Sequence, residues 1–298
     1  MSEAPSTVGD GAPRVPYKDL PAEPRKEILF RRRFGLVASA RELWAYRELV
    51  VSLAERDLRV RYKQAALGLA WALVTPLLLM AAFALVFTRL TDVSAHGVPY
   101  PLFATIGLVP WSFFSTAFSR GGTSLVNNIP LLNKLYCPRE VFPLASVGLA
   151  VVDALAASFV LALLFPLSGY APRLESLYAP LLLLIALCFT IGLTLLVSAI
   201  VVYLRDLQVL LPLIVQFGLF VTPVAYGSDV VVHGPAGRAL FALVNPLAAV
   251  IDGLRRGILF GHPPELIPTL CGAGTAVLVL ILGFTFFKRM EAGLADIA

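Results

Sequence analysis

The feature that most constrains this chain is its first long stretch without charge, Gln64 to Thr88, which contains no Asp, Glu, Lys or Arg over 25 residues. At about 1.5 Å of rise per residue, such a helix is longer than the roughly 30 Å hydrocarbon core of a bilayer. The whole chain is 58% hydrophobic and only 14% charged, whereas about a quarter of the residues of a soluble domain are charged. The sequence therefore predicts an all-α integral membrane protein.

Further charge-poor stretches of adequate length predict six membrane spans in all. We expect them at about 69–90, 101–126, 141–167, 177–203, 208–226 and 266–288. Around this six-span domain of residues 69–290, we expect a mobile cytosolic tail at 1–40, an amphipathic interface helix at 41–68, and a short cytosolic tail at 291–298.

The distribution of Lys and Arg predicts the orientation. With a cytosolic N-terminus, the inner segments hold 19 of the 24 cations and the outer segments hold 5. Both termini are therefore expected in the cytosol. The cations follow this topology and form no basic patch with interleaved aromatics, so we expect no nucleic-acid partner. The three histidines are far apart in sequence, and no metal site is predicted.

The segment before the first span predicts a helix in the membrane interface. Polar residues recur at helical spacing along one stripe, and apolar residues lie mainly on the opposite side. The stripe consists of Arg41, Glu48, Ser52, Glu55 and Arg59. We expect this helix to continue without a turn into the first span. A soluble helix packed on another domain is the alternative, but little chain is left to build such a domain.

Two connections are unusually apolar. In the inner loop 127–143, Pro130 and Pro138 bracket leucines at helical spacing, which predicts a short helix that either docks on a partner or packs beneath the spans. The outer connection 226–265 predicts a re-entrant or interfacial helical hairpin between spans five and six, with a helix from about 245 to 261. Its Arg255 and Arg256 are interpreted as ion-pair partners of Asp252 or Asp229, with anionic headgroups or a phosphate as the alternative.

Asp153 lies about a dozen residues into the third span, where an unpaired carboxylate is costly. It belongs either to a proton relay or to a helix-to-helix hydrogen bond made by a protonated or paired acid. Since no Lys, Arg or second acid is expected at membrane depth to pass a proton on, the hydrogen bond is favoured. Aromatic residues crowd the second and fifth spans; they suit stacking on sugar rings or an aromatic belt, and the belt needs fewer assumptions.

The motifs of catalysis and nucleotide binding do not occur in the sequence. There is no GxxxxGK[ST], HExxH, GxSxG or acidic cluster of the DxD type, so the chain holds no nucleotide by the P-loop mechanism and has no recognisable catalytic constellation. We therefore expect no cofactor in this chain and, if the protein does work, a partner that supplies the energy.

Several segments, in the right order, resemble one family. RDLRVRY before LGLAWALVTP, LVPWSFFSTAF, LVNNIPLLNKLYCPREVFP, YLRDLQVLLPLIVQFGLFVTPVAYG and NPLAAVIDGLRRGIL are similar to the membrane subunits of type-2 ABC exporters of the polysaccharide-export kind. These include the O-antigen, teichoic acid and galactan permeases. The resemblance covers roughly residues 42–290.

The resemblance implies a homodimer in the bacterial inner membrane that binds two cytosolic ATPase subunits, which hold ATP and Mg. The dimer would export lipid-linked polysaccharide through a channel between its copies. The ATPase-coupling loop would be formed by Leu131, Leu132, Asn133, Lys134, Leu135, Tyr136, Pro138 and Arg139. Lipid headgroups or the lipid pyrophosphate would lie near Arg56, Arg59, Arg61 and Tyr62. The hairpin 229–262 would be the outer gate, and the channel and gate candidates are Phe113, Phe114, Phe118, Asp153, Phe217, Phe220, Tyr226, Arg255 and Arg256.

Two other functions remain open from the sequence. One is an exporter of drugs or small lipids, which shares the fold. The other is a membrane-embedded enzyme of lipid-linked sugar metabolism, against which the absence of an acidic and histidine cluster argues.

Overall fold

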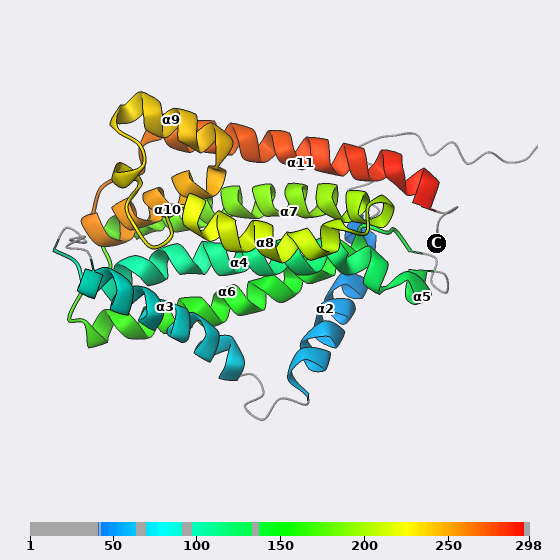
Figure 1. Ribbon diagram of the computed structural model, residues 1–298, viewed down its shortest axis with the longest axis horizontal. Helices are drawn as coiled ribbons and strands as arrows, with labels where there is room; N and C mark the ends of the chain where they lie inside the picture. The colour runs from blue at the N-terminus through cyan, green and yellow to red at the C-terminus, as the bar shows by residue number, and fades with distance from the viewer. Residues whose placement is uncertain (1–40, 42, 64–69, 91–96, 133–136, 295–298) are drawn as a thin grey trace, which may run out of the picture.

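The computed structural model describes residues 41, 43–63, 70–90, 97–132 and 137–294, and every regular element in this part of the chain is helical (Figure 1). The α-helices are α2 (Arg47–Tyr62), α3 (Trp71–Leu90), α4 (Tyr100–Asn127), α5 (Ile129–Leu132), α6 (Val141–Leu167), α7 (Ala179–Tyr203), α8 (Leu207–Val221), α9 (Gly234–Val244), α10 (Pro246–Arg255) and α11 (Leu266–Leu294). Two 3-10 turns, η3 (Leu174–Tyr178) and η4 (Ser228–Val230), and a π-helical turn, η5 (Arg256–Phe260), complete the described elements.

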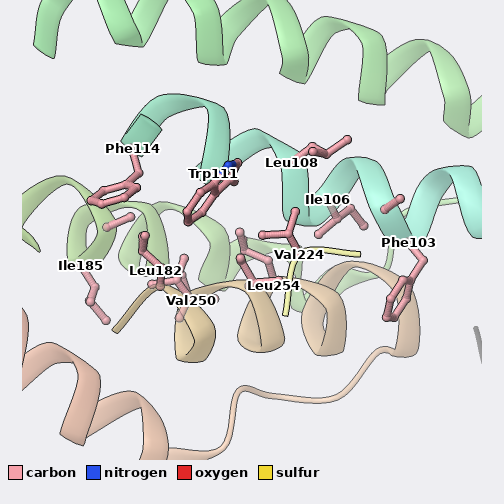
Figure 2. Packing of buried hydrophobic residues seen from close by; sticks show 14 of the residues in the cluster. Phe103, Ile106, Leu108, Trp111, Phe114, Leu182, Ile185, Val224, Val250 and Leu254 are labelled. Carbon is pink, nitrogen blue, oxygen red and sulfur yellow. The ribbon is translucent and has the colours of Figure 1, made fainter. Parts of the chain in front are cut away.

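Four long helices, α4, α6, α7 and α11, run side by side through the molecule (Figure 1). Helix α4 is the central one, because it contacts α3, α6, α7, α8 and α10 and most of its residues are buried. Its Ile106 and Trp111 lie on the side of α4 that faces the labelled side chains of α7 and α10 in the main core, whereas Leu108 lies on the opposite side of the helix (Figure 2). Burial of most of a helix requires few charged residues, and Arg120 is the single charged residue of α4.

Helices occupy all six apolar segments of the sequence. Four of them, Tyr100–Asn127, Val141–Leu167, Leu174–Tyr203 and Leu266–Glu291, are long and apolar enough to cross a membrane. The apolar stretches Trp71–Phe87 and Leu207–Val221 are shorter, so the six-span topology stays a prediction. Helix α8 ends at Val221 and not at 226, since Thr222 precedes Pro223 and adopts an extended conformation.

The expected continuous helix from the interface segment into the first span is wrong. Helix α2 ends at Tyr62, a turn follows at Lys63, and α3 begins at Trp71 in a different direction (Figure 1). The direction of α2 is set by packing: it contacts α6, and a Cβ built at Gly148 of α6 would lie 3.3 Å from Cβ of Ala54. Helix α2 runs at a steep angle to the long helices (Figure 1), and its Leu53 is buried in the contact.

Helices α7 and α11 cross at two glycines. A Cβ on Gly192 would lie 2.5 Å from the backbone of Leu280, and a Cβ on Gly283 would collide with the carbonyl of Gly192. Small residues at such a crossing allow two backbones to approach closely, which is a common device between helices in membranes. The contact fixes the register of the two helices.

We expect Gly283→Ala to destabilise the protein by about 1–3 kcal/mol, because the added methyl group forces the two backbones apart. The measurement is thermal unfolding in detergent. Gly274→Ala, on the same helix with no atom near the added Cβ, is the matched control and gains up to about 1 kcal/mol from helix propensity. Equal melting temperatures for the two variants would contradict the close crossing.

Candidate functional site

The inner loop begins at one end of the bundle, where α2 also begins and α11 ends (Figure 1). Leu131 and Leu132 are half-buried against a small core built from α2, α4, α6, α7 and α11. Pro138 is buried, and Arg139 donates from Nη1 to the carbonyl oxygen of Glu291 at 3.2 Å. The predicted coupling residues Asn133, Lys134, Leu135 and Tyr136 lie outside the described residues. The described part of the loop thus packs beneath the long helices.

A buried charge cluster follows this loop. Glu140, 2% exposed, forms an ion pair with Lys288, 8% exposed, and Lys288 also contacts Glu291 at 3.0 Å. The second carboxylate oxygen of Glu140 is buried without a hydrogen-bond partner. Burial raises the pKa of Glu140, the hydrogen bond from Lys288 opposes this shift, and Glu291 adds to it. Sequence reasoning missed this cluster, because nothing in the local pattern relates residue 140 to residue 288.

Asp153 is held by two other helices. Its Oδ2 lies 2.6 Å from Nη1 of Arg61 on α2 and accepts a hydrogen bond from Thr116 of α4 at 3.2 Å. Of the two interpretations left open by the sequence, this geometry supports a paired acid. The sequence argument overlooked Arg61 because it assigned that residue to the headgroups.

The other predicted headgroup residues have different surroundings. Arg56 bonds to Asp57 on its own helix and donates from Nη2 to Oδ1 of Asn128 at 2.9 Å. Arg59 is exposed and pairs with Glu55 at 3.4 Å. The side chain of Tyr62 lies outside the described residues. Arg59 is therefore the predicted headgroup residue with the most exposed guanidinium.

At the opposite end of the bundle, Arg255 of α10 is fully buried. Its guanidinium donates to the carbonyl oxygens of Pro223 and Tyr226 at 2.8 Å, of Val224 at 2.5 Å and of Phe103 at 3.3 Å. It also lies 3.7 Å from the centre of the Phe103 ring, in a cation–π geometry. The fork of five N–H donors makes Arg the side chain suited to such a set of acceptors.

The predicted ion pairs of the hairpin with Asp252 or Asp229 are wrong for both arginines. Arg255 bonds to backbone carbonyls, and Arg256 pairs with Glu265 at 2.7 Å. Glu265 also forms an ion pair with Arg238, with 2.9 Å between Oε1 and Nη1. Asp252 accepts a hydrogen bond from the hydroxyl of Ser228. These groups border a cleft between α9, α10 and α11 that is lined by Ser228, Arg238, Asp252, Arg256, Glu265 and Thr269, with apolar side chains between them. The hairpin is thus locked by several polar contacts.

The aromatic candidates divide into two groups. Phe113, Phe114 and Phe118 of α4 are buried, and Phe114 stacks on Phe118 and on Phe189 of α7. These positions serve packing in the core rather than contact with a glycan. Phe217 and Phe220 of α8 are exposed, and Tyr226 donates its hydroxyl to the carbonyl of Phe220. Of these aromatic candidates, Phe217 and Phe220 of α8 are the rings that face outward from the chain.

Comparison with known proteins identifies the family. Residues 48–259 match the model of the ABC-2 type transporter family, and this stretch is more than half of the chain. The chain belongs to the ABC-2 type transporter family. This confirms the resemblance seen in the motifs. The members of this family are membrane-embedded, multi-pass transporters, so the long apolar helices of this chain lie in a membrane.

Named relatives of this ABC-2 type protein are export subunits. It is 29% identical over 263 residues to the O-antigen export system permease protein RfbA of Myxococcus xanthus. The aligned residues cover 88% of this chain and 99% of the relative. The protein of the same name from Klebsiella pneumoniae is 27% identical over 84% of this chain and 95% of its own length. The polysialic acid transport protein KpsM of Escherichia coli is 24% identical, over 81% and 93% of the two chains.

Proposed function

We propose that the chain is the permease subunit of an ATP-driven exporter that moves lipid-linked polysaccharide from the cytosolic to the outer side of the bacterial inner membrane. The observation that carries this proposal is the similarity to O-antigen export permeases over nearly the whole length of both chains. The chain itself is not an enzyme in this proposal, and a separate subunit binds ATP and Mg and hydrolyses ATP.

The partner ATPase docks at the end of the bundle that carries the inner loop. This end presents α5 and the beginning of α2, and the segment 131–139 provides the contact surface. The excess of Lys and Arg on the predicted inner segments supports a cytosolic position for this end and for both termini. Two ATPase copies serve two permease copies.

The second permease copy faces α8. Only Leu211 of this helix is buried in the single chain, whereas Phe217 and Phe220 are 69% and 63% exposed. An apolar helix with exposed aromatic rings packs either against lipid or against a second copy of the chain. We assign the exposed face of α8 to the channel between the two copies. Closure of the ATPase pair would lever the two halves apart, so that the lipid anchor reorients and the glycan passes.

The test is co-purification. The chain, carrying the affinity tag, is co-expressed with the ATPase encoded beside it, and subunit stoichiometry and ATP hydrolysis are measured. We expect a complex of two plus two, and loss of the ATPase in Leu131→Ala/Leu132→Ala. The control Leu43→Ala/Leu49→Ala removes two half-buried leucines from the α2 side of the same small core and is expected to keep the ATPase.

The outcomes separate the candidate functions. A chain that purifies alone and forms product from lipid-linked sugars without an ATPase would overturn the proposal in favour of an enzyme. A complex whose ATP hydrolysis responds to drugs or small lipids but not to lipid-linked glycan would indicate the other exporter class. Retention of the ATPase by Leu131→Ala/Leu132→Ala would place docking elsewhere on the chain.

A further inference from the structure

The two ends of the inner loop are attached to the bundle in different ways. At the α4 end, Asn128 accepts a hydrogen bond from Arg56, whose side chain is 41% exposed. At the α6 end, Glu140 and Lys288 form a buried ion pair. An exposed contact exchanges readily with water and contributes little, whereas a buried charge pair fixes the relative position of its two elements. The firm attachment is therefore to α11.

The cluster at Glu140 is poorly explained by stability alone. Two carboxylates, Glu140 and Glu291, share the ammonium group of Lys288, and one oxygen of Glu140 remains without a partner. A buried ion pair costs desolvation energy that well-packed apolar side chains of similar volume avoid. Arg139, the preceding residue, adds a second link by donating to the carbonyl oxygen of Glu291. These contacts connect the end of the inner loop with the last turns of α11 at specific atoms.

Helix α11 extends from this cluster to the outer hairpin (Figure 1). Along its length it packs on α7, with the close glycine crossing described above. Its outer half contacts α9 and α10, where Thr275 donates to the carbonyl oxygen of Leu243 at 3.0 Å. A long helix packed at both ends is one of the rigid elements through which energetic coupling between distant sites is carried.

We propose that the Glu140–Lys288 ion pair is the joint through which movement of the inner loop reaches the outer hairpin by way of α11. The inference rests on the proposed function, in which a partner ATPase moves this loop. Glu140 and Lys288 are positioning residues that touch neither nucleotide nor glycan. Their role is to couple ATP hydrolysis to glycan export. Without the joint, the loop still binds the ATPase, but its movement is lost before it reaches the hairpin.

The experiment uses the complete permease–ATPase complex in proteoliposomes that contain lipid-linked glycan. Glycan exported per ATP hydrolysed is measured for the wild type and for Glu140→Gln. We expect Glu140→Gln to keep the ATPase bound and hydrolysis within about twofold of the wild type, while the export ratio falls by about tenfold, in the range typical of coupling between sites. Glu55→Gln breaks an exposed ion pair of α2 and is expected to leave the ratio unchanged.

Two paired variants separate coupling from folding. Glu140→Leu/Lys288→Met keeps apolar packing without charge and is expected to fold with the same low ratio, so it decides the question if Glu140→Gln does not fold. Glu140→Lys/Lys288→Glu reverses the pair and is expected to recover a substantial part of the ratio. A wild-type ratio in the apolar pair, or a parallel loss of hydrolysis and export in Glu140→Gln, would overturn the joint. A wild-type chain that binds no ATPase would instead overturn the proposed function.

Discussion

Arg255→Met is expected to lower the free energy of unfolding by about 3–5 kcal/mol, the largest loss for a single substitution in the outer hairpin. The guanidinium is 2% exposed and donates to four carbonyl oxygens. Without it, these acceptors stay buried and unsatisfied, and each such group costs about 1–3 kcal/mol before the structure relaxes. Since Met fills much of the same volume, the loss reports the missing donors and not a cavity.

The position of these carbonyls explains why the effect is large. Three of them belong to the irregular segment 223–226, which follows α8 and has no helical partners for its carbonyls. Tyr100 donates to the next free carbonyl, that of Ala225, at 2.8 Å. Gly107 leaves room for the arrangement, because a Cβ there would lie 2.6 Å from the oxygen of Val224. Arg255 thus ties the beginning of the outer hairpin to α4.

The measurement for Arg255→Met is thermal unfolding in detergent together with export of glycan. Its matched control is Arg256→Met, the neighbouring arginine, which pairs with Glu265 through side chains that are 34% and 23% exposed. An ion pair that stays in contact with water is worth about 1 kcal/mol or less. Arg255→Lys keeps the charge but loses the planar fork, and we expect it to recover only part of the stability. Similar melting temperatures for the Arg255 and Arg256 variants would show that the carbonyl contacts are not stabilising.

The helices of this chain were predictable because their signal is local. A bilayer-length apolar run without charge specifies α4, α7 and α11 without any knowledge of their neighbours, and a run interrupted only by Asp153 specifies α6. The amphipathic pattern of α2 is equally local. The direction of α2 relative to α3 was not predictable, because it depends on the contact of α2 with α6, about a hundred residues further along the chain.

The polar contacts of the candidate site depend on contacts between distant segments, which one sequence does not reveal. Arg255 lies three residues from Asp252, and a local argument selects that acid, whereas the fold brings four backbone carbonyls to the guanidinium. Lys288 sits at the end of an apolar span and resembles an ordinary topological cation until α11 is placed beside Glu140. From the sequence, Asp153, Arg255 and Arg256 stand out as unusual charges without their partners, whereas Glu140 and Lys288 do not stand out at all.

Asp153→Leu is the second substitution for which we expect a large effect, about 2–4 kcal/mol of lost stability. It removes the acceptor of both Arg61 and Thr116. The cost stays below that of a fully buried pair, since the Arg61 side chain is 28% exposed and is able to turn toward water or headgroups. Asp153→Asn keeps the shape of the side chain and one acceptor oxygen. We expect its loss of stability to be less than half that of Asp153→Leu.

A double-mutant cycle with Arg61→Leu and Asp153→Leu isolates the pair. The two residues are in contact, so we expect the double variant to be more stable than the sum of the single losses predicts, by about 0.5–3 kcal/mol. Glycan export by the wild type, the two single variants and the double variant then shows whether the Arg61–Asp153 pair is needed for transport. A double variant that is stable but does not export would mean that the attachment of α2 to the middle of α6 and α4 serves transport. A stable double variant that exports normally would mean that apolar packing replaces the pair, and that α2 needs only to be held in place.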